Sequence, residues 1–108
     1  MNSDCFVNGS PDHMIIAIDF DETLTADSKL WQVFIETAKQ LEHRVVCVTA
    51  RRDTEENRET VREWMRSHGI AIPVYFTSLG SKVEYMQRLG IKVGIWIDDD
   101  PRRCALGH

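Results

Sequence analysis

Four short apolar runs alternate with longer amphipathic stretches along this chain. The runs cover residues 14–18, 45–49, 72–76 and 92–97, and the first is apolar throughout, as is typical of a strand buried on both faces of a parallel sheet. The stretches between them repeat apolar residues at helical spacing. The order strand, helix, strand, helix, strand, helix, strand predicts three crossover units and therefore a parallel α/β sheet.

Cap residues predict where the three helices begin. The signals are Asp27 or Ser28 for the first helix, the pair Asp53 and Glu56 for the second, and the pair Ser81 and Glu84 for the third. We expect these helices to end near residues 42, 68 and 90. The faces expected to be buried are Leu30, Phe34, Ala38 and Leu41 in the first helix, Val61, Trp64 and Met65 in the second, and Val83, Met86 and Leu89 in the third.

Length and composition predict one small domain. The chain has 108 residues, and we expect a single domain over residues 14–108 after a flexible leader at 1–13. No apolar run approaches membrane-spanning length, and the leader lacks the apolar core of a signal peptide, so we expect a cytoplasmic protein that does not contact membranes. Cys5, Cys47 and Cys104 form neither a disulfide framework nor a close metal-binding cluster. The net charge of -4 argues against general nucleic-acid affinity.

Two acids, Asp19 and Asp21, follow the first strand directly. Side chains alternate along a strand, so both acids can face one cleft only where the chain turns, with Phe20 between them packing inward. Two nearby carboxylates need a shared proton or a cation, and Mg²⁺ prefers such oxygen ligands. An isolated Asp-x-Asp at a strand end is better explained as a turn with capping value, so the metal interpretation depends on the residues downstream.

Four stretches together resemble the motifs of the haloacid dehalogenase (HAD) superfamily of phosphatases. Asp19-Phe-Asp-Glu-Thr23 resembles the first motif, and Val45-Val-Cys-Val-Thr49 resembles the second, an apolar run ending in a hydroxyl. Lys82 resembles the third-motif lysine, and Ile95-Trp-Ile-Asp-Asp-Asp-Pro101 resembles the acidic fourth motif. The four lie in the family's order and cover the chain from Met14 to about Arg103. The resemblance implies a Rossmann-like, HAD-like three-layer sandwich with a minimal sheet of order 3-2-1-4.

The resemblance also implies a reaction and a role for each residue. Asp19 would be the nucleophile that forms an aspartyl-phosphate, and Asp21 the general acid and base. Thr49, Lys82 and Arg51 would bind the phosphoryl oxygens. The Mg²⁺ ligands implied are Asp19, Asp21 through its backbone carbonyl, Asp98 and Asp99. The function implied is Mg²⁺-dependent hydrolysis of phosphomonoesters.

The chain leaves no room for the cap domain that many HAD enzymes insert after the first motif. An open site implies that a large phosphorylated substrate, or a second subunit in a homo-oligomer, covers it. Arg51 and the helix position of Trp64 resemble polynucleotide kinase phosphatase domains, and Asp98, Asp99 and Pro101 resemble deoxyribonucleotidases. These features favour nucleotide or nucleic-acid-end phosphates, although Arg51 is equally well explained as a solvated side chain or one paired with nearby acids.

Three other interpretations compete with this one. A phosphotransferase would pass the phosphoryl group to an acceptor other than water. A catalytically silent binding module would keep the fold and the metal site for a partner. A receiver-like signalling domain also uses acids, a hydroxyl and a lysine around Mg²⁺, but its acid cluster does not follow the last strand.

Overall fold

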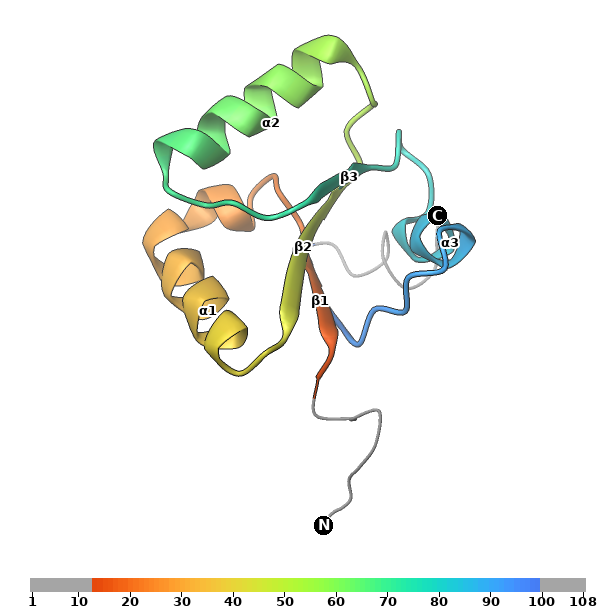
Figure 1. Ribbon diagram of the computed structural model, residues 1–108. Helices are drawn as coiled ribbons and strands as arrows, with labels where there is room; N and C mark the ends of the chain where they lie inside the picture. Colours follow the sequence, from red (N-terminus) through yellow and green to blue (C-terminus); the bar gives the residue numbers. More distant parts are fainter. Residues whose placement is uncertain (1–12, 100–108) are drawn as a thin grey trace.

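The predicted strands and helices form in the predicted order within residues 13–99, the part of the chain that the computed structural model describes (Figure 1). The elements are β1 (Ile15–Ile18), the short 3-10 helix η1 (Leu24–Ala26), α1 (Ser28–Gln40), β2 (Arg44–Thr49), α2 (Glu55–Ser67), β3 (Val74–Phe76), α3 (Lys82–Arg88) and β4 (Ile95–Ile97). The predicted leader up to residue 12, and the part of the chain from residue 100 onward, which includes the end of the fourth motif, lie outside the described residues. No helix within the described range has both the length and the apolar character needed to cross a membrane.

The four strands form one parallel sheet of order β3-β2-β1-β4, as predicted. Ile18 at the end of β1 lies opposite Cys47 of β2 and Ile97 of β4, so the carboxyl ends of these strands reach the same edge of the sheet. The chain runs outward in one direction from β1 to β3 and in the other from β1 to β4. Ligands of open α/β sheets bind at such a switch point, outside the carboxyl ends of the strands.

Helices cover both faces of the sheet, which gives the three layers of a Rossmann-like sandwich (Figure 1). On one face, Ile18 and Cys47 are fully buried with side chains of α1 and α2. On the other face, Ala17 and Val48 pack with Met86 of α3. Successive strand residues therefore alternate between the two cores, as the pleat requires. Full burial of one such large aliphatic side chain contributes about 1.5–3 kcal/mol.

The buried face of α1 differs in part from the predicted stripe. Ala38 is buried and Phe34 packs against the core, as predicted, but Leu30 and Leu41 are 54% and 61% exposed and Ile35 is buried. Trp31 packs against the core and donates a hydrogen bond from Nε1 to the backbone oxygen of Thr23 at 2.7 Å. This bond fixes Trp31 on the core side of the helix, whereas Leu30 lies on the exposed side.

Two further helix predictions need correction. Helix α2 begins with Thr54 as its N-cap, because Thr54 has the extended backbone that an N-cap needs and its side chain accepts from the Asn57 N–H. Asp53 instead binds Arg58 at 2.6 Å. In α3 Met86 is buried as predicted, but Leu89 lies at the C-cap, past the buried turn, and is 51% exposed.

Candidate functional site

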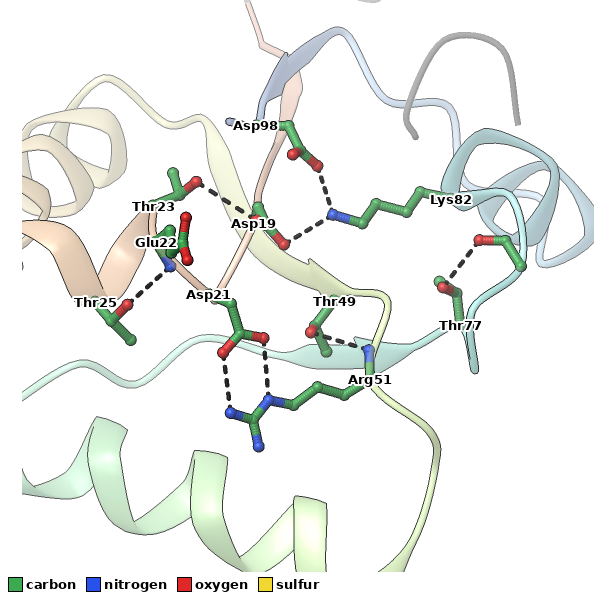
Figure 2. Close-up of polar contacts among 11 residues, drawn as sticks. Asp19, Asp21, Glu22, Thr23, Thr25, Thr49, Arg51, Thr77, Lys82 and Asp98 are labelled. Atoms are coloured by element: carbon green, nitrogen blue, oxygen red, sulfur yellow. Dashed lines mark hydrogen bonds and ion pairs between the residues drawn. The ribbon is translucent and has the colours of Figure 1, made fainter. Parts of the chain in front are cut away.

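The chain leaves the sheet immediately after Asp19. The Asp19 N–H still donates to the Ile97 oxygen of β4 at 2.9 Å, but the Asp19 oxygen accepts from Leu24, which closes a turn. Glu22 in this turn has a φ of 62° and donates its N–H to the Thr25 hydroxyl at 2.9 Å (Figure 2). Phe20 packs inward and is 2% exposed, as predicted. The turn therefore places Asp19 in the sheet's crevice and Asp21 at its rim.

Lys82 joins the turn after β1 to the end of β4. It is the first residue of α3 and only 2% exposed, and its Nζ donates to Asp19 Oδ1 at 2.8 Å and to Asp98 Oδ2 at 2.5 Å (Figure 2). The Thr23 hydroxyl donates to the other oxygen of Asp19 at 3.5 Å. Residues far apart in the sequence therefore converge on one carboxylate, as the predicted strand order requires.

Negative charge exceeds positive charge at this point. Carboxylate oxygens of Asp19, Asp98 and Asp99 all lie within 4.8 Å of one another. Three carboxylates and the Lys82 ammonium sum to a charge of -2 when all are ionised. Burial raises the pKa of Asp19 to about 6 although Lys82 lowers it, and the charge of Asp98 and a hydrogen bond with Asp99 add to the rise. Burial would lower the pKa of Lys82, but its bonds to Asp19 and Asp98 raise it above its usual value.

These three acids suit a hard divalent cation. They offer only oxygen ligands, and a charge of +2 balances the excess that they and Lys82 leave. Of the predicted metal ligands, the structure brings together the carboxylates of Asp19, Asp98 and Asp99. The Asp21 carboxylate is not one of this group.

Asp21 instead forms a two-point ion pair with Arg51. Its oxygens accept from Arg51 Nη2 at 2.9 Å and Nε at 3.0 Å (Figure 2). Arg51 also donates from Nη1 to Asn57 at 3.0 Å, and its guanidinium lies 5.4 Å from the centre of the Phe20 ring. The pair raises the pKa of Arg51. Arg51 was predicted to bind phosphate, and the structure places its guanidinium on Asp21.

Asn57 is a residue that sequence analysis missed. Its amide nitrogen donates to the Arg52 oxygen at 2.9 Å, which orients the amide so that its oxygen faces Arg51. The available signal was a neutral amide in the otherwise charged first turn of the helix that follows the second strand.

Most of the predicted site residues line one cavity of about 240 Å³. Its walls are Asp19, Asp21, Glu22, Ala50, Lys82, Asp98 and Asp99. Thr49 is fully buried beside this cavity rather than in its wall, and its hydroxyl accepts from the Arg51 N–H at 3.3 Å. The cavity thus combines a cluster of three acids with one buried ammonium at the carboxyl ends of β1 and β4.

Comparisons with protein-family models, with curated proteins and with solved structures found no match to this chain. The functional interpretation therefore depends on the geometry described above and on the four resembling motifs.

Proposed function

We propose that this protein is a HAD-like phosphomonoester hydrolase that works through an aspartyl-phosphate with bound Mg²⁺. One observation carries the proposal: the Asp19 carboxylate lies 2.8 Å from a buried ammonium and within 4.8 Å of two further carboxylates, at the topological switch point of the sheet. A fold does not need this cluster of acids and a lysine for stability, since buried ion pairs contribute little net free energy. Phosphoryl transfer needs both a nucleophile and groups that balance the charge of the phosphate.

Asp19 is the nucleophile in this proposal. One carboxylate oxygen forms a bond to phosphorus as the ester oxygen leaves, and water then attacks the phosphorus and releases inorganic phosphate and the free carboxylate. Lys82 offsets the negative charge on the phosphoryl oxygens. Asp19, Asp98 and Asp99 would hold Mg²⁺, whose charge lets the anionic carboxylate approach an anionic phosphate.

Asp21 is the proton-transfer group in this proposal. It lines the cavity two residues beyond Asp19, where its half-exposed carboxyl can protonate the leaving oxygen and later accept a proton from water. Arg51 holds it at the rim through two hydrogen bonds, and Asn57 orients Arg51 by accepting a third. Thr49 supports the same segment by accepting from the Arg51 N–H.

The substrate is proposed to be large compared with its phosphate. Between Asp21 and α1 the chain forms only η1, and between β2 and α3 it forms only α2 and β3, so the described residues contain no cap over the cavity. A cavity of about 240 Å³ accepts a phosphoryl group and leaves the rest of the substrate outside. Phosphorylated nucleotides or nucleic-acid ends meet this requirement.

The test is release of inorganic phosphate from an aryl phosphate, a panel of nucleotides and 3'-phosphorylated oligonucleotides, with Mg²⁺ or with a chelator. We expect turnover that requires the metal and is lost in Asp19→Asn. Asp27→Asn is the matched control, because it makes the same change at a helix cap where asparagine serves equally well. If the folded wild type releases no phosphate from any substrate, the hydrolase proposal is wrong. Transfer of the phosphoryl group to an added alcohol without hydrolysis would indicate a phosphotransferase.

A further inference from the structure

The larger of the two cavities described lies at the open edge of the sheet, away from the acid cluster. It has a volume of about 620 Å³ and is walled by α2, by β3 and by Tyr85 of α3. Val74 and Phe76 of β3 pack with the core beneath α2, whereas Tyr75 packs with Tyr85 on the other face. The cavity therefore wraps around the edge of β3 from one face of the sheet to the other. We refer to it as the edge groove.

The backbone of β3 presents unpaired polar groups to this groove. The Cys47 N–H donates to the Pro73 oxygen at 2.8 Å, and the Thr77 N–H donates to the Thr49 oxygen at 2.9 Å. Polar groups alternate along a strand, so residues 73, 75 and 77 direct theirs to β2 while Val74 and Phe76 direct theirs outward. No strand within residues 13–99 pairs with that side of β3. Such an edge is a template for one more strand.

Three arginine side chains of α2 line the same groove. Arg58, Arg62 and Arg66 stand four residues apart in α2 and all line the cavity, at a spacing of about 6 Å along the helix axis. Asp53 is the acid among the lining residues, so these side chains sum to +2, in a chain whose net charge is -4.

These arginines have exposed partners of their own. Arg58 binds Asp53 at 2.6 Å, Arg62 binds Glu59 at 2.7 Å, and Arg66 binds Glu63. Exposed pairs of this kind are weak because water and salt screen them. Carboxylates of a ligand can therefore compete for the guanidinium groups.

We propose that the edge groove binds an extended segment of a partner protein that alternates acidic and apolar residues and adds to β3 as a further strand. Backbone groups of Val74 and Phe76 would form hydrogen bonds with the segment. The apolar side chains that line the groove would contact the apolar residues of the segment, and the arginines would pair with its carboxylates. Pairing of β3 with a second copy would bring the two arginine rows toward each other, which like charge disfavours. A nucleic-acid strand would suit the charge but would leave the apolar wall and the strand edge unmatched. This proposal does not depend on phosphatase activity.

The test uses a fluorescein-labelled peptide of about eight residues that alternates valine and glutamate, a length common for strands. Fluorescence anisotropy measures its binding to the full chain, and we expect the binding to weaken about tenfold or more in Arg62→Glu. Arg44→Glu is the matched control, since Arg44 is an exposed arginine at the amino end of β2 and does not line the groove. A peptide in which lysine replaces glutamate should bind far less.

Two further measurements separate strand addition from charge attraction alone. N-methylation of alternate peptide amides should abolish binding, because it removes the donors that face β3. Amide hydrogen exchange of Val74 and Phe76 should slow at saturating peptide, whereas that of Tyr75 should not change. The proposal is overturned if the methylated peptide binds equally well, if an oligothymidylate binds in place of the peptide, or if neither probe binds the folded chain. Asp19→Asn should bind the peptide like wild type, so failure here and failure of the phosphatase are distinguishable.

Discussion

Replacement of Lys82 with methionine tests the charge balance of the candidate site. Methionine keeps much of the side-chain length and removes the ammonium. Lys82 is 2% exposed, and its Nζ lies 2.8 Å from Asp19 and 2.5 Å from Asp98. Removal of one partner from a buried ion pair costs about 3–5 kcal/mol, because the remaining charge stays buried without compensation. We expect Lys82→Met to lower the free energy of unfolding by this amount at about pH 8, which is above the pKa of about 6 that Asp19 has in the folded wild type.

The cost should decrease at lower pH. Burial holds the pKa of Asp19 at about 6 even though Lys82 lowers it, so loss of the ammonium moves this pKa further above its unfolded value near 3.8. A carboxyl with a higher pKa in the folded chain binds a proton more tightly there. Its stabilising contribution is complete below the unfolded pKa and is lost as the pH rises through the folded pKa. Between about pH 8 and pH 5, protonation of Asp19 should therefore recover part of the stability that Lys82→Met removes.

Urea unfolding followed by tryptophan fluorescence measures both effects, with a chelator present so that no divalent cation replaces the ammonium. Lys92→Met is the matched control, since Lys92 is exposed and should change the free energy of unfolding by no more than about 0.5 kcal/mol. The reasoning is refuted if Lys82→Met stays within about 1 kcal/mol of wild type at the higher pH, well below the expected cost. An equal loss at both pH values would refute the proposed role of carboxyl protonation.

Three other predictions address the rest of the site and the fold. Arg51→Lys should reduce kcat for phosphate release about tenfold or more while thermal unfolding changes little, because a single ammonium cannot replace a two-point bond to a half-exposed carboxylate. Mg²⁺ should raise the unfolding midpoint of wild type but not of the double variant Asp98→Asn/Asp99→Asn, as differential scanning fluorimetry would show; an equal rise in both would place the ion elsewhere. Thr54→Ala should cost about 1 kcal/mol in urea unfolding as a lost helix cap, and Asp53→Ala clearly less; the reverse order would restore Asp53 as the cap.

The fold was predictable because its strands carry unambiguous patterns. An apolar run such as residues 14–18 has few alternatives to a buried parallel strand, and acids at the ends of two strands can share one cation only where those strands are neighbours. Helix faces were less predictable. Leu30 and Leu41 fit the helical period as well as the buried Ile35 does, and the structure buries the side of the helix on which Trp31 bonds to Thr23. A local pattern contains no information on such a bond.

The site was predictable residue by residue but not contact by contact. Asp19, Lys82, Asp98 and Asp99 converge as expected, because motif order and strand order place them at one edge of the sheet. The partner of Arg51 was not predictable, since both a phosphate and a carboxylate suit a guanidinium. Which of the two Arg51 binds depends on how close the turn after β1 lies to the loop after β2, and that distance is set only when the chain folds.

Backbone strain around the cavity supports the same location for function. Within residues 13–99, four non-glycine residues have a positive φ, and Glu22, Ser78 and Leu79 lie in the two loops that precede η1 and α3. Each such residue costs about 1–2 kcal/mol, so surrounding bonds must hold it in place. The Ser78 N–H donates to the Arg51 oxygen at 3.1 Å, and the Leu79 N–H donates to the Ala50 oxygen at 2.7 Å. These bonds join the loop before Lys82 to the segment that carries Arg51, so they fix the position of the buried ammonium relative to the guanidinium that pairs with Asp21.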